Sequence, residues 1–145
     1  RCREQDPDTL GAIWIYDVAS IDTLDGATQE QSLSHFKIPR VQGDVARCTM
    51  HNFNVLPVKD RYVGVSASYS GGTTVFDFTD RANPVELGHN DPHGANTWSS
   101  YWYNGHVYTN DTGRGFDVML VADPARAGTE RLPYLNPQTQ EQLID

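Results

Sequence analysis

Three short stretches between Tyr62 and His89 constrain the fold of this chain most. Tyr62–Tyr69 alternates apolar and small polar residues, Thr73–Phe78 is rich in β-branched and aromatic residues, and Val85–His89 is a shorter apolar stretch. Each pattern is typical of a β-strand. Ser70–Gly72 and Thr79–Pro84 separate them and have the composition of turns. Short strands joined by tight turns predict an antiparallel meander.

Further strands are predicted on both sides of this meander. They cover Gly11–Val18, His35–Ile38, Cys48–Leu56, Asn96–Tyr103, His106–Thr109 and Phe116–Val121. Asn104-Gly105 stands between two of them, and this dipeptide favours a two-residue type I′ hairpin because both residues accept a positive φ. Ala19–Ser34 is polar and reads as a loop.

The strands belong to an internal repeat. Gly72–Asp77 aligns with Gly115–Leu120 at a spacing of about 43 residues, which is close to the roughly 40–45 residue period of a four-stranded propeller blade. Gly11–Asp17 aligns with Gly71–Asp77 at a wider spacing, which a loop insertion at Ala19–Ser34 would explain.

The repeat predicts an all-β fold and a β-propeller segment, with about one complete four-stranded antiparallel blade flanked by two partial blades. Residues 1–10 would form an N-terminal extension, residues 11–121 the blades, and residues 122–145 an extended C-terminal tail. A closed propeller needs at least four blades, so we expect another chain, or a removed part of the same polypeptide, to complete it. A small self-contained β-sandwich is the alternative.

Composition and net charge exclude some classes of binding partner. The net charge of −8 argues against nucleic acid and anionic membranes, which require a basic surface. No apolar run approaches the roughly 20 residues of a membrane span.

The chain begins at Arg1 without an initiator Met, which suggests processing from a longer polypeptide. Cys2 and Cys48 are the two cysteines and fit one disulfide in an oxidising compartment, although two unrelated thiols would give the same count.

The central meander from Tyr62 to Leu87 resembles the LVIVD-repeat family of secreted bacterial β-propellers. The resemblance rests on a strand, Gly71-Gly72, a strand ending in Asp77, an Asp-x-x-x-Pro turn and an outer strand, and it covers roughly residues 11–121. Arg81 stands where the family usually has Pro. The resemblance implies an extracellular or periplasmic propeller that presents loops to a partner. More loosely, the architecture is similar to methanethiol oxidase propellers, which hold a metal with channel histidines, but no matching motif is present.

Two sets of residues are candidates for binding. His51, near the start of the predicted innermost strand, and His93 could hold a divalent metal such as Ca, Cu or Zn; alternatively, they hold strand ends and a loop together. Trp98 and Trp102, which alternation places on one face of their strand, could stack on a sugar or an aromatic ligand; alternatively, they pack in the core.

No catalytic signature such as Gly-x-Ser-x-Gly or His-Glu-x-x-His is present. We therefore expect a secreted binding or assembly module rather than an enzyme, with no cofactor and with a protein partner or additional copies that complete the propeller. The alternative is part of a metal-dependent propeller enzyme with channel histidines.

Overall fold

The computed structural model describes residues 2–17, 31–136 and 139–140. These residues form nine strands and a short 3-10 helix: β1 (Ile13–Ile15), β2 (Ser34–Phe36), β3 (His51–Val55), β4 (Val63–Ala67), β5 (Thr73–Asp77), β6 (Val85–Asn90), β7 (Thr97–Tyr103), β8 (His106–Asp111), β9 (Gly115–Leu120) and η3 (Pro124–Gly128). The all-β prediction is confirmed. Most of the predicted loop Ala19–Ser34 and the end of the predicted strand Gly11–Val18 lie outside the described residues.

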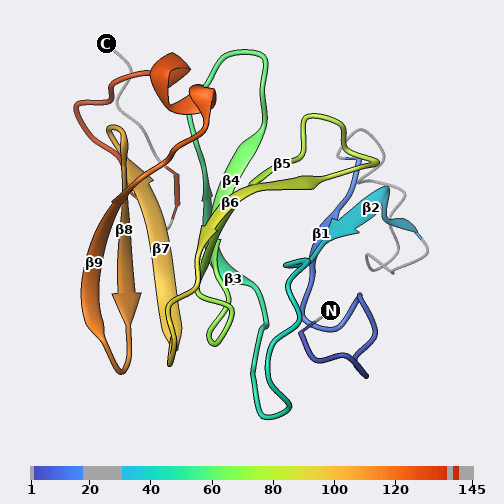
Figure 1. Ribbon diagram of the computed structural model, residues 1–145. Helices are drawn as coiled ribbons and strands as arrows, with labels where there is room; N and C mark the ends of the chain where they lie inside the picture. Colours follow the sequence, from blue (N-terminus) through green and yellow to red (C-terminus); the bar gives the residue numbers. More distant parts are fainter. Residues whose placement is uncertain (1, 18–30, 137–138, 141–145) are drawn as a thin grey trace.

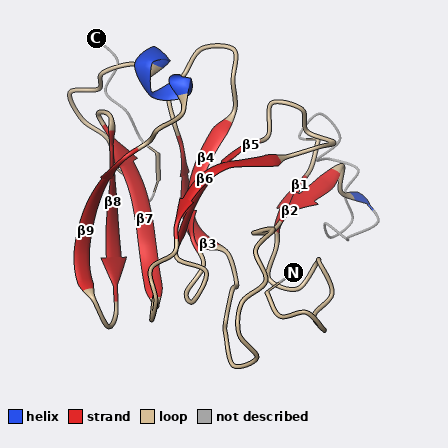
Figure 2. Ribbon diagram, viewed as in Figure 1, coloured by secondary structure: helices blue, strands red, loops and turns tan. Residues whose placement is uncertain are grey.

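The strands form three separate antiparallel sheets, none of which closes on itself. Their orders are β1-β2, β3-β4-β5-β6 and β7-β8-β9, so every sheet is a meander in chain order. Figures 1 and 2 show the three sheets following one another across the molecule, with the four-stranded sheet in the middle. The strand order predicted for the central unit is confirmed.

The two central strands of the four-stranded sheet, β4 and β5, are buried on both faces, which is why their residues lack a strict apolar–polar alternation. All five residues of β4 are buried. Val65 and Val75 face Trp102 and Val107 of the three-stranded sheet and form the larger core with them. Alternate residues on the opposite face pack on the first sheet, because successive side chains of a strand point to opposite faces.

The second core lies between the four-stranded sheet and the N-terminal part of the chain. Phe76 of β5 stacks on Phe36 of β2 with ring centroids 4.4 Å apart. Cys2 and Cys48 lie in the same core and form a disulfide with a Cα–Cα distance of 5.4 Å. The predicted bridge is therefore present, and it joins the N-terminal segment to the connection that leads into β3.

The β7–β8 connection is the predicted two-residue hairpin. Asn104 has φ 45° and Gly105 φ 92°, and Tyr103 pairs directly with His106. Both values lie in the left-handed region that a type I′ turn requires.

The chain after β9 returns to the larger core. Val121, Ala125 and Leu132 are buried there. Asp123 caps η3 by accepting a hydrogen bond of 2.7 Å from the Ala125 amide. Arg61 donates to both Asp123, at 2.9 Å, and Asp77, at 2.6 Å, and so links the end of β5 to η3.

Within the described residues, no helix has the length and apolar character needed to cross a membrane.

Candidate binding surfaces

The outer face of the three-stranded sheet is uncovered and apolar. Phe116, Val118 and Leu120 of β9 are 65%, 53% and 59% exposed. Tyr101 pairs with Tyr108, and Tyr108 pairs with Val118, so these three side chains lie side by side on the same face. The Tyr108 ring stacks near Phe116 with centroids 6.2 Å apart. We call this side of β7, β8 and β9 the open face. A contiguous exposed apolar patch on a sheet typically marks an interaction surface.

The repeat explains which face is uncovered. Val118 is the counterpart of Val75, and Met119 is the counterpart of Phe76. Phe76 and Met119 both face the preceding sheet, because Phe76 packs in the N-terminal core and Met119 against the larger core. Val75 and Val118 therefore both face the following sheet. That sheet is present for Val75, whereas Val118 is exposed.

The contact between the two larger sheets shows what covers such a face. Thr73, Ser100 and Thr109 meet there in a buried triangle of hydroxyl groups, with oxygen–oxygen distances of 2.8, 3.0 and 3.1 Å. The buried Asn54 side chain accepts a 2.6 Å hydrogen bond from the Trp102 amide. Buried polar groups that satisfy one another fix the register of two packed surfaces.

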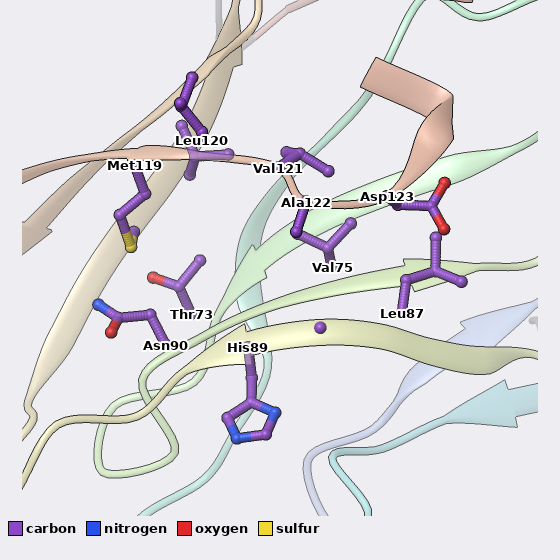
Figure 3. A pocket seen from close by; sticks show the side chains of 12 residues that line it. Thr73, Val75, Leu87, His89, Asn90, Met119, Leu120, Val121, Ala122 and Asp123 are labelled. Carbon is purple, nitrogen blue, oxygen red and sulfur yellow. The ribbon is translucent and has the colours of Figure 1, made fainter. Parts of the chain in front are cut away.

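A groove lies at the rim of this contact, between β6 and β9. It has a volume of about 160 Å³. Figure 3 shows Val75 and Leu87 from the four-stranded sheet pointing into it beside Met119 and Val121, whereas the His89 ring points away. We call it the edge groove. Its lining is mostly apolar, and a cavity of roughly 150 Å³ of this kind takes one benzene-sized group.

His51 belongs to an aromatic cluster. Its ring centroid lies 4.4 Å from that of Tyr69 and 5.7 Å from that of Trp98. Its Nε2 is buried without a hydrogen-bond partner among the described residues, and burial lowers the pKa of His51. A neutral imidazole packed between aromatic rings is therefore the form that this position favours.

His93 is exposed on the loop between β6 and β7. The described part of the chain contains no group of three or more His, Cys, Asp or Glu side chains arranged to hold a metal ion. The structure thus offers no ligand set in which His51 and His93 act together.

Trp98 and Trp102 differ sharply in exposure. Trp98 is 50% exposed and Trp102 is fully buried. Both rings lie on the side of β7 that faces the four-stranded sheet, as alternation predicts, because Trp102 packs in the larger core and the Trp98 ring contacts His51 and Tyr69. Trp102 is therefore a core residue, and Trp98 alone is accessible to a ligand.

Asp111 stabilises the loop that precedes β9. Burial acts to raise its pKa, but hydrogen bonds from the backbone amides of Asn96, Gly113 and Arg114 outweigh this effect, and the pKa is lowered. The amide hydrogen bonds are 2.7 to 2.9 Å long. The role of this residue is structural, since a carboxylate that accepts three backbone amides defines a turn.

The sequence did not single out the open face or the edge groove. Phe116–Val121 was recognised only as a strand. Its apolar residues fall on both faces of the strand, and this signal is shared with the buried strands of the central sheet. Which strand remains uncovered depends on how many sheets the chain contributes.

Comparison of the chain with models of protein families, with curated proteins and with solved structures finds no match in any of the three.

Proposed function

We propose that this chain is a segment of a secreted β-propeller of the LVIVD-repeat kind, and that it acts as a binding and assembly module. Its three meander sheets correspond to one complete blade and parts of two others. Further blades, supplied from outside these 145 residues, complete the propeller. The Cys2–Cys48 disulfide supports an oxidising, extracytoplasmic location.

The open face is the observation that carries this proposal. Phe116 and Val118 are the repeat counterparts of Thr73 and Val75, which the three-stranded sheet buries. An uncovered face of this composition is costly for a soluble monomer, because about 25 cal/mol is lost for each Å² of apolar surface left in water. A further sheet of the same repeat would bury Phe116, Val118 and Leu120 as the three-stranded sheet buries Val75.

The test is the native mass of the protein purified without denaturation from the cells that produce it. We expect a mass clearly above the 16.2 kDa of one chain, with a second copy or a second polypeptide present. Val118→Lys places a charge in the open face and should release the chain as a monomer.

Val45→Lys is the matched control, because Val45 is 96% exposed and lies outside the open face. It should leave the complex intact. A folded and monodisperse monomer of the unmodified protein would contradict the proposal and favour a small self-contained β-sandwich.

A further inference from the structure

The two larger sheets differ by one strand on the side of the edge groove. In the four-stranded sheet β5 is followed by β6, whereas no described strand pairs with the outer edge of β9. The edge groove lies at the place where a strand beyond β9 would cover β6, since its lining comes from β6 on one side and from the C-terminal end of β9 on the other.

The hairpin geometry shows which backbone groups of β9 are free. Tyr103 and His106 close a two-residue type I′ turn, so they form a hydrogen-bonded pair. Alternation along β8 then directs the Val107 backbone toward β9, where it pairs with Met119. Along β9, the backbone groups of successive residues also alternate between the side of β8 and the opposite side. The amides and carbonyls of Phe116, Val118 and Leu120 therefore point to the free edge.

The edge of β9 is more regular than the edge of β6, and Asp117 is the one charged residue of β9. The pairing of β6 with β5 is interrupted by a register shift between Val75 and Phe76, and β6 carries Glu86 and His89. β9 pairs with β8 through six consecutive residues without a shift. Natural edge strands avoid adding a further strand by means of bulges and charged residues. Among these two edges, β9 is the one suited to strand addition.

We propose that the free edge of β9 accepts a fourth antiparallel β-strand donated by a separate polypeptide, and that one apolar side chain of this strand fills the edge groove. The inference rests on the proposed function, because it identifies the part of the completing polypeptide that contacts β9. Main-chain hydrogen bonds supply affinity in this mode of recognition, and the pockets for alternate side chains supply specificity.

The neighbouring side chains define the chemistry of the donated strand. The residue opposite Met119 points into the edge groove and must be apolar. The residue opposite Asp117 lies two positions further along the donated strand on the same face. A basic residue is favoured there, because the ion pair that Asp117 makes among the described residues is a long one, of 3.9 Å to Arg114. On the other face, an apolar residue beside Val118 would extend the open face.

A second copy of this chain does not fit this edge through its own β9. An antiparallel pair of identical strands is related by a two-fold axis perpendicular to the sheet. Both four-stranded sheets would then lie on the same side of the joined sheet, and the edge strands β6 of the two copies would compete for the space above the paired β9 strands. A single extended segment avoids this conflict.

The test uses backbone amide exchange of the isotope-labelled full chain, with and without a synthetic peptide. The probe has about ten residues of alternating Val and Thr and one Lys two positions after its central Val. We expect the amides of Phe116, Val118 and Leu120 to exchange rapidly in the free protein. At about 90% occupancy they should exchange about tenfold more slowly, since exchange then proceeds only from the unbound fraction.

Two variants block the site by different means, and each has a matched control. Val118→Pro removes an amide that points to the free edge and keeps the bonds to β8; Val118→Thr keeps this amide. Gly88→Leu fills the groove from β6, because Gly88 pairs with Val75 and its Cβ would meet no atom within 4 Å; Gly88→Ala leaves the groove open. The blocking variants should lose the protection and the controls should keep it.

Three results would overturn the proposal. These are no protection at saturating peptide concentration, protection that persists in both blocking variants, and edge amides that are already protected in the isolated monomer. Failure of the proposed function is recognised separately, since it would appear as a monomeric native mass whether or not the peptide binds.

Discussion

Lys37 is a residue whose environment sets its chemistry. Its ammonium group donates hydrogen bonds to the carbonyls of Leu10 and Cys48 beside the disulfide. Burial lowers the pKa of Lys37 to about 8 from its ordinary value of 10.5, and the nearby Asp6 carboxylate counteracts this effect only in part. The side chain therefore joins the N-terminal segment to the connection before β3 at the cost of desolvating a charge.

The stability of the protein should rise between about pH 8 and pH 10.5, and Lys37 should be one cause. In this window the unfolded chain binds more protons at Lys37 than the folded chain, so raising the pH favours the folded state. The check is urea denaturation at several pH values in this range. Lys37→Met should weaken the rise, whereas Lys59→Met, at an exposed position, should not. An unchanged pH dependence in Lys37→Met would contradict the assignment.

Gly64 shows why one strand residue has no side chain. The strand pairing places it opposite Phe76, and a Cβ at Gly64 would lie 2.6 Å from Cζ of that ring. The Phe76 ring thus covers the backbone of β4 while it stacks on Phe36. Gly64 is therefore required by close packing against the Phe76 ring rather than by its backbone conformation.

At the scale of elements, the β7–β8 hairpin is specified locally. Gly105 has φ 92° and a Cβ there would meet nothing within 4 Å. Its requirement is therefore purely conformational. Asp77 makes a similar local contribution at the end of β5, where its side chain accepts a 2.7 Å hydrogen bond from the Thr79 amide.

Gly105→Ala should destabilise the protein by about 1–2 kcal/mol, the usual cost of a left-handed conformation for a residue with a Cβ. Gly43→Ala is the control, since Gly43 also has no atom within 4 Å of a built Cβ but has no left-handed φ. The control should be neutral or slightly stabilising. Chemical denaturation measures both, and equal effects of the two substitutions would show that the turn is not a determinant of stability.

At the scale of the whole molecule, the chain is a series of sheets joined by two cores. The four-stranded sheet contributes to both of them, with the three-stranded sheet on one face and the N-terminal segment on the other. This arrangement leaves the open face and the edge groove at the end of the series. The disulfide is one of several contacts that join the N-terminal segment to the rest, together with the Phe36–Phe76 stack and the hydrogen bond from the Met50 amide to the Gly11 carbonyl.

Removing the disulfide should lower the free energy of unfolding by about 4 kcal/mol in the chain-entropy model, because it closes a loop with a sequence separation of 46 residues. The double variant Cys2→Ala, Cys48→Ala should unfold at a lower urea concentration than the oxidised protein. Reduction of the unmodified protein should produce a similar loss. Equal stability of oxidised and reduced protein would show that the N-terminal segment does not contribute to the cooperative unit.

The sequence by itself determined the local structure of this protein. Alternating apolar residues, turn-forming dipeptides and a spacing of about 43 residues were sufficient to predict the strands, the hairpin and the strand order of the central sheet. These features depend on neighbouring residues, whose geometry is limited by steric exclusion and by the two-residue period of a strand. The pairing of Cys2 with Cys48 followed from their number, once an oxidising compartment was assumed.

Only the tertiary structure decided which residues are accessible. Trp98 is half exposed whereas Trp102 on the same strand is fully buried, and the packing of three sheets in series left Val118 exposed while it buried its counterpart Val75. Exposure depends on which sheets are present to cover a face, and apolar strands look alike in sequence whether or not a neighbour covers them. The open face and the edge groove therefore became visible only when the sheets were placed against one another.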